Sequence, residues 1–291
     1  TGQSSVKSTH DKRKGGQGSL RNKLLHNPQA VIGTLLIAII LLMGVLAPFL
    51  APHDPMAVDI TKKFLEPCNE YPFGTDQLGR CVLSRLLYGA RYSLGLALPI
   101  LAFLALIGTT LGMLCAWFGG IFDRLMTIVC DIFMAFPPLV IVLTLIGVIG
   151  QGAVNLILSI ILSMWVWFVK VVRSYVLIEK DKDYITAAKI SGCSGADILF
   201  SHILPNILPL LVVYFSTGIA SIILMISGYS FLGLGLGNDI PEWGAMLNSA
   251  KQYLYSNPML IVYPGTCILL TAAGFNLFGE ALRDILSPEE E

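Results

Sequence analysis

The chain has 291 residues, of which 55% are hydrophobic and 13% are charged, and its formal net charge is zero. Soluble domains carry about 25% charged residues, so this composition excludes an ordinary soluble domain. The zero net charge also gives no indication of nucleic-acid binding.

Long stretches without Asp, Glu, Lys, Arg or His predict where the chain crosses a membrane. They cover residues 29–52, 92–122, 132–169, 203–238 and 252–279. A spanning helix needs about 20 apolar residues. Four of the stretches therefore hold one span each, and the stretch at 132–169 holds two spans separated by a tight turn at 147–155. The sequence predicts an all-α integral membrane protein with six transmembrane helices.

The basic residues predict how these spans are oriented. The polar segment 1–27 is expected to be a cytoplasmic tail, and the first transmembrane helix is expected at 28–50. With that tail inside, the inner segments hold thirteen Lys and Arg residues and the outer segments hold six. This is the bias expected of cytoplasmic loops, and it makes the C-terminal tail at 283–291 cytoplasmic as well.

The first outer segment, 51–91, is predicted to contain a helix that lies in the membrane interface. Five apolar residues recur there at helical spacing with three arginines between them, which is typical of interfacial helices. A second outer element, 238–258, carries Trp243, Tyr253 and Tyr255, which are expected at interfacial depth. Cys68 and Cys81 are the only cysteines in the outer segments, and a disulfide between them is one of two alternatives.

The sequence gives little support for nucleotide binding, hydrolysis or ion coupling by this chain alone. No phosphate-binding loop of the form GxxxxGK(S/T) is present. A membrane hydrolase needs a nucleophile with a base, and none of the four histidines lies in mid-span. An ion-coupled carrier keeps ionisable groups at membrane depth, where Asp131 is the only candidate. We interpret Asp131 as a structural hydrogen-bonding partner, with a self-contained channel or secondary transporter as the alternative function.

Two features of the spans bear on a path between the helices. Phe136-Pro137-Pro138 is expected to break the third span and free backbone carbonyls there. Gly108 and Gly112 form a small-xxx-small pattern that favours close helix packing. The candidate path residues are Asp131, Phe136, Pro137, Met225 and Ser227. No metal-ligand spacing is present. The outer residues His53, Asp54, Cys68 and Glu70 are either solvated loop residues, which is the interpretation we favour, or contacts for a metal.

A polar hairpin at 183–206 interrupts two of the most apolar segments. Its first short helix is predicted to end at Gly192 in the left-handed conformation. Ser194 and Asp197 resemble the capping pair of a second helix, after which Pro205 is expected to redirect the chain into the fifth span. The pattern alone fits a pair of helices in the headgroup region as well as a rigid knob that docks in a cytoplasmic partner.

The same hairpin resembles the cytoplasmic coupling loop, or EAA loop, of permease subunits in ABC importers. The matching residues are Ala187-Ala188, Gly192 and the run from His202 to Asn206, whereas Thr186 stands where the loop usually has glutamate. Segments 73–91, 230–247 and 264–288 resemble the dipeptide/oligopeptide/nickel branch of these permeases, with Cys81 in place of an aspartate common there. The chain is identified on these four segments as a member of that family.

The resemblance implies a type I ABC importer permease fold, with a permease core at 92–282 and a coupling loop at 179–206. The expected partners are a second homologous permease in a heterodimer, two cytoplasmic ATPase subunits, an extracytoplasmic solute-binding protein and membrane lipid. The chain itself would bind no cofactor, because ATP and Mg²⁺ would be held by the ATPase subunits. The expected location is the bacterial inner membrane, and the expected cargo is a peptide, nickel or a metal chelate. The residues expected to couple to the ATPase are Tyr184, Thr186, Ala187, Ala188, Gly192, Cys193, Ser194 and Asp197.

Overall fold

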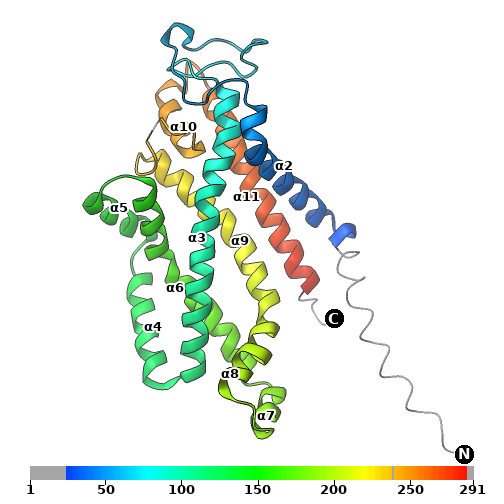
Figure 1. Cartoon of the computed structure of the whole chain (residues 1–291). Coiled ribbons are helices and arrows are strands. Elements are labelled where there is room, and N and C mark those ends of the chain that lie inside the picture. The colour runs from blue at the N-terminus through cyan, green and yellow to red at the C-terminus, as the bar shows by residue number, and fades with distance from the viewer. Residues whose placement is uncertain (1–23, 238, 287–291) are drawn as a thin grey trace, which may run out of the picture.

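The structure is a computed structural model that describes residues 24–237 and 239–286. Most of the predicted tail at 1–27 and the last part of the tail at 283–291 lie outside these residues. The described residues fold into a bundle of long helices with an irregular segment at one end and a helical hairpin at the other (Figure 1). The elongated shape places the two candidate functional ends far apart.

Within the described residues, five helices are long and apolar enough to cross a membrane. They are α2 (Pro28–Leu50), α3 (Val82–Phe118), α6 (Ala153–Lys180), α9 (Leu204–Phe231) with the helical turns before it, and α11 (Met259–Leu286). The sixth predicted span is a bent pair, α4 (Gly120–Met134) and α5 (Pro138–Ile149), whose axes differ by 82°. The six-span prediction holds when this pair is counted as one broken span.

The start of the first span follows from its local sequence. The side chain of Asn27 accepts hydrogen bonds from the backbone N–H groups of Gln29 and Ala30, at 2.9 and 3.3 Å. Pro28 occupies the first helical position, where its missing N–H costs nothing. These two features explain why helix α2 begins at Pro28, and the helix ends at Leu50.

The predicted break and turn around α5 are both confirmed. Helix α4 ends at Met134 and α5 begins at Pro138, because consecutive prolines cannot continue a helical hydrogen-bond ladder. Gly150 and Gly152 have φ values of 86° and 146°, a backbone conformation that side chains disfavour. These two glycines form the tight turn between α5 and α6.

The interfacial helix predicted before residue 91 is wrong. Residues 82–91 are the first turns of α3, which continues without a break to Phe118. Val82 and Leu86 are buried in the main hydrophobic core and Arg85 is only 1% exposed. The boundary predicted between an outer segment and the permease core at residues 91 and 92 therefore falls inside a single helix.

Helices α3 and α6 pack against each other through the predicted glycine pattern. A side-chain carbon on Gly108 would collide with Phe168, and one on Gly112 would lie 2.7 Å from the carbonyl oxygen of Val169. Only glycine permits this approach, so the small-xxx-small interpretation is confirmed.

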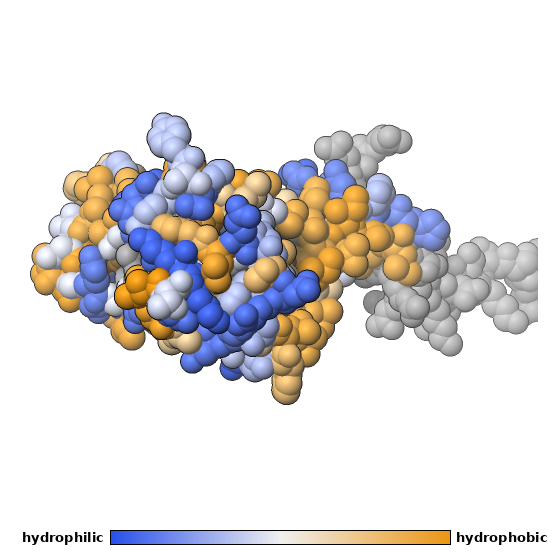
Figure 2. Space-filling view, turned by 90° about the horizontal axis from the view of Figure 1, so that it is seen from above, coloured by the Kyte–Doolittle hydropathy of each residue, from blue (hydrophilic) through white to orange (hydrophobic). Residues whose placement is uncertain are grey.

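The irregular end of the molecule, residues 51–81, 232–237 and 239–258, is called the outer cap here. It contains the short helix α10 (Trp243–Ala250) and two single turns, η1 (Ile60–Lys62) and η3 (Lys251–Tyr253). Figure 2 shows the molecule from this side, with hydrophilic side chains lying between apolar ones. The interfacial position predicted for Trp243 is wrong, because its side chain is fully buried, whereas Tyr255 is 99% exposed. Cys68 and Cys81 are not paired.

Candidate functional site

The hairpin at 179–206, called the coupling hairpin here, forms the end of the bundle opposite the outer cap (Figure 1). Its first helix, α7 (Asp183–Ile190), ends as the sequence predicts. Gly192 has a φ of 83°, and its N–H donates to the carbonyl of Lys189 at 3.1 Å. The N–H of Cys193 donates to the carbonyl of Ala188 at 3.1 Å. This left-handed glycine satisfies the last carbonyls of α7 and turns the chain back.

The predicted capping pair also forms. The Ser194 hydroxyl accepts from the N–H of Asp197 at 3.1 Å and donates to the Asp197 carboxylate at 2.6 Å. This arrangement starts the short helix α8 (Gly195–Asp197). The turn between α7 and α8 is thus fixed by one glycine and one serine.

The prediction that Pro205 redirects the chain is wrong. Helix α8 continues through a π-helical segment, Ile198–Ile203, directly into α9. Proline cannot donate to the ladder and its ring clashes with the preceding turn. The wider turn accommodates it, because the N–H of Leu204 donates to the carbonyl of Leu199, five residues back. The hairpin is therefore continuous with the span that follows it.

Buried apolar residues and one hydrogen-bond chain hold α7 against the spans. Ile185 is fully buried in a cluster with Ile198 and Ile203. The Tyr184 hydroxyl donates to Glu179 Oε1 at 2.6 Å and accepts from Asn206 Nδ2 at 3.0 Å. Burial and the bond to Glu179 raise the pKa of Tyr184 to about 12. Tyr184 thus links the end of α6 to the start of α9, a role its spacing did not indicate.

The tip of the coupling hairpin presents apolar side chains to its surroundings. Ile190 is 82% exposed and Phe200 is 62% exposed. Gly192 has no atom within 4 Å of the position that a side-chain carbon would take. The other predicted coupling residues lie on the same hairpin, with Thr186, Ala187, Cys193, Ser194 and Asp197 exposed and Ala188 partly buried.

The candidate path residues come from three parts of the chain. Asp131, in α4, forms an ion pair with Lys170 of α6, which supports its interpretation as a structural partner. Phe136 and Pro137 are exposed at the bend between α4 and α5. Met225 and Ser227 lie in α9, where Ser227 is buried and its hydroxyl has no hydrogen-bond partner. No three His, Cys, Asp or Glu side chains form a metal-binding group in the described residues.

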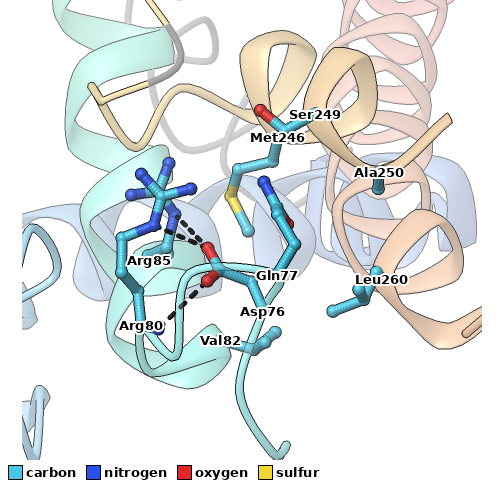
Figure 3. Close-up of a pocket in the computed structure, with 9 residues that line it drawn as sticks. All are labelled: Asp76, Gln77, Arg80, Val82, Arg85, Met246, Ser249, Ala250 and Leu260. Atoms are coloured by element: carbon cyan, nitrogen blue, oxygen red, sulfur yellow. Dashed lines mark hydrogen bonds and ion pairs between the residues drawn. The ribbon is translucent and has the colours of Figure 1, made fainter. Parts of the chain in front are cut away.

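The sequence interpretation missed a group of buried charges in the outer cap. The side chains converge around a small cavity beneath α10 (Figure 3). Asp76 Oδ2 accepts from Arg80 Nε at 2.7 Å and lies 3.7 Å from Arg85 Nε. Arg85 also donates to the backbone carbonyls of Pro55 and Asp239, at 3.0 and 3.3 Å. The run TDQLGR (75–80) could have indicated this cluster, because a turn within it can bring the Asp76 and Arg80 side chains together.

Glu242 is a further buried ionisable residue in the outer cap. Its carboxylate accepts from the N–H groups of Gly244 and Ala245, both at 2.9 Å, and caps α10. Burial raises the pKa of this carboxyl above its ordinary value, and the two backbone hydrogen bonds act in the opposite direction. The outer cap is thus organised by polar groups inside it.

Comparisons with known proteins agree with this architecture. Residues 108–290 match the family described as binding-protein-dependent transport system inner membrane component. Residues 18–67 match the N-terminal TM domain of oligopeptide transport permease C.

Three curated relatives align over most of the chain. The nickel transport system permease protein NikC of Escherichia coli (strain K12) is 34% identical, over 88% of this chain and 93% of its own length. The probable D,D-dipeptide transport system permease protein DdpC of the same strain is 37% identical, over 90% of this chain and 88% of its own length. The metal-staphylopine import system permease protein CntC of Staphylococcus aureus (strain NCTC 8325 / PS 47) is 37% identical, over 91% of this chain and 92% of its own length.

These matches decide between the functions left open by the residues. A self-contained channel or secondary transporter works without a binding protein, so the match to a binding-protein-dependent system excludes that alternative. Membership also implies that a binding protein and an ATPase are partners of this chain. The chain belongs to the binding-protein-dependent transport system inner membrane components, and it is a multi-pass permease subunit of an ABC importer rather than its ATPase.

Proposed function

We propose that this permease forms one half of a translocation path, paired in the bacterial inner membrane with a second homologous permease. Two ATPase subunits, which hold ATP and Mg²⁺, lie beneath the coupling hairpin, and a solute-binding protein delivers cargo to the outer cap. Both termini are cytoplasmic. The thirteen-to-six distribution of basic residues supports this orientation, because the hairpin end then lies inside.

The exposed apolar tip of the coupling hairpin carries this proposal. Ile190, in α7, lies outside the candidate spans, and Phe200 is exposed in the helical turns that lead into α9. Gly192, between them in the sequence, has open space around it. Large exposed apolar side chains outside the lipid mark an interaction surface. A groove on an ATPase subunit that receives the tip buries these side chains.

The internal bonds of the hairpin suit it to transmit movement. The capped turn at Gly192 and Ser194, together with the Tyr184 bonds to Glu179 and Asn206, lets α7 move as one body with α6 and α9. Closure of the ATPase pair then shifts these spans between inward- and outward-open states. Asp131, Phe136, Pro137, Met225 and Ser227 are the proposed path residues.

For the cargo we propose a nickel ion, a metal chelate or a short peptide. The support is that relatives with comparable identity are named for nickel, D,D-dipeptide and metal-staphylopine transport. In this architecture the binding protein performs most of the selection, so the permease path needs only a few residues that fit several small polar solutes.

The test of the coupling role is Gly192→Asp. The left-handed backbone makes any side chain there unfavourable by about 1 kcal/mol. A carboxylate added at the proposed contact is also buried without a partner, which is costly. The variant is expected to insert and to pair with the second permease, but to lose both transport and the stimulation of ATP hydrolysis by the loaded binding protein in reconstituted vesicles.

Gly150→Asp is the matched control. Gly150 also has a positive φ, of 86°, and open space around it, but it lies in the turn between α5 and α6, away from the hairpin. It is expected to retain transport. Transport by Gly192→Asp at the parent rate contradicts the coupling role.

A further inference from the structure

Several segments of the outer cap contact one turn of α3 near the outer end of that helix. Arg85 donates to the backbone carbonyls of Pro55, Asp239 and Ile240, so one guanidinium joins segments about 30 and 155 residues away. Trp243 donates from Nε1 to the carbonyl of Leu86 at 3.1 Å. A side-chain carbon on Gly89 would collide with the Trp243 ring, so the ring lies directly on the α3 backbone.

The inner end of α3 is attached to the coupling hairpin. Lys180 Nζ donates to the carbonyls of Ala116 and Trp117, both at 2.9 Å. These belong to the last turn of α3, where carbonyls lack partners within the helix. The Trp117 ring packs on Gly195, where an added side-chain carbon would lie 2.9 Å from it. Lys180 ends α6 and Gly195 begins α8, so both contacts come from the hairpin.

Between these ends α3 is a single helix of 37 residues, about 55 Å long at 1.5 Å per residue. The hydrocarbon core of a membrane is about 30 Å thick, so the helix reaches past it to both attachments. Gly108 and Gly112 hold α3 closely against α6. Such an apolar contact resists separation, but it contains no directional bond that resists sliding along the helix axis. The Lys180 hydrogen bonds supply that bond at the hairpin.

We propose that α3 carries movement of the coupling hairpin to the outer cap, and that Trp117 and Lys180 are the positioning residues that attach it. This inference rests on the proposed coupling role of the hairpin. Helices α6 and α9 are covalently continuous with the hairpin and follow it directly. Helix α3 follows through side-chain contacts, and it is the helix on which Arg85 and Trp243 assemble the cap that faces the binding protein.

The test follows hydrogen–deuterium exchange in the complex of the permease with its second permease chain and ATPase subunits in lipid nanodiscs. Exchange is compared without nucleotide and after trapping with ATP, Mg²⁺ and vanadate, so no cargo is needed. In the parent, trapping is expected to change exchange in peptides from 183–206 and also in peptides from 51–81 and 232–258.

Trp117→Ala and Lys180→Met are each expected to reduce the change in the outer-cap peptides about threefold or more. The change in the hairpin peptides is expected to persist. Trp117→Phe keeps a ring against Gly195 and is expected to restore the outer response. Arg124→Met is the control, because Arg124 is an exposed cation at the inner end of α4. It is expected to behave as the parent.

The outcomes separate the two proposals. A parent complex without any change at 183–206 contradicts the proposed function itself. A parent that responds at the hairpin but not at the outer cap overturns the role of α3. That role is also overturned if Trp117→Ala and Lys180→Met, purified as intact complexes, keep the full outer response. If one variant fails to assemble, the other decides.

Discussion

The two ends of the molecule are held together by different groups: the outer cap by buried polar and aromatic side chains, and the coupling hairpin by buried aliphatic side chains and a capped turn. The outer cap buries Arg85, Glu242 and Trp243 inside the chain and satisfies them with backbone groups. The coupling hairpin leaves Ile190 and Phe200 exposed. Buried polar groups that have hydrogen-bond partners favour one structure, whereas large exposed apolar side chains are available to a partner. The outer cap is thus fixed from within by its polar contacts, and the proposed function assigns the apolar tip of the hairpin to an ATPase contact.

The largest effect on the isolated chain is expected from Trp243→Ala. The fully buried ring fills the space between α10 and α3, and its loss also removes the indole hydrogen bond to the Leu86 carbonyl. Removal of a buried tryptophan costs about 3–5 kcal/mol. Thermal unfolding of the purified permease in detergent measures the effect, with Tyr255→Ala as an exposed aromatic control that is expected to change little. Equal decreases in unfolding temperature for Trp243→Ala and Tyr255→Ala contradict a stabilising role of the buried ring in the outer cap.

A smaller, pH-dependent effect is expected from Glu242→Gln. One of the two N–H groups that Glu242 caps loses its acceptor, which costs about 1 kcal/mol. Because burial raises the pKa of Glu242 above its usual 4.5, the folded chain keeps a proton that the unfolded chain has lost. The parent therefore loses stability as pH rises from about 4.5 to the folded-state pKa, and the glutamine variant does not.

The measurement is the unfolding temperature of both proteins at several pH values upward from about 4.5. The deficit of Glu242→Gln is expected to be widest at the lowest pH and to narrow as pH rises. A deficit that stays constant across the series indicates that this carboxyl is not held protonated in the folded cap.

In the hairpin, Tyr184→Phe is expected to have a modest effect on stability and a clearer effect on coupling. The change removes two hydrogen bonds, to Glu179 and from Asn206, and keeps the ring. Loss of one such bond costs about 1 kcal/mol. Binding-protein-stimulated ATP hydrolysis in the assembled complex is expected to fall relative to the basal rate. Tyr255→Phe, at an exposed position of the outer cap, is the control for loss of a hydroxyl.

The smallest effect on the isolated chain is expected from Ile190→Ser. The side chain is 82% exposed, so its removal leaves the unfolding temperature near that of the parent. At the proposed interface the same change removes a buried apolar contact and is expected to weaken binding of the ATPase subunits about tenfold. A titration of purified ATPase onto the permease in nanodiscs measures this, and undiminished affinity places the contact elsewhere.

Local pattern was sufficient for the spans and for the shape of the hairpin. The bounds of α2, the break at Pro137-Pro138, the glycine turn before α6 and the left-handed Gly192 each depend on a few neighbouring residues. The missing N–H of proline and the conformational freedom of glycine act within one or two turns of chain, and the length of an uncharged stretch is a property of one continuous segment. These properties can therefore be read from a single segment.

The burial of charged and aromatic residues was decided by the tertiary structure. Arg85 and Trp243 have the spacing of interfacial residues, but their partners are carbonyls about 155 residues away along the chain. Likewise, Pro205 fits a continuous helix because the turn before it widens, and the Tyr184 hydroxyl bonds to Glu179 and Asn206 because packing brings these two residues together. An amphipathic pattern shows that one face needs covering. Whether lipid, a partner or a distant part of the same chain covers it depends on contacts that form only when the helices pack.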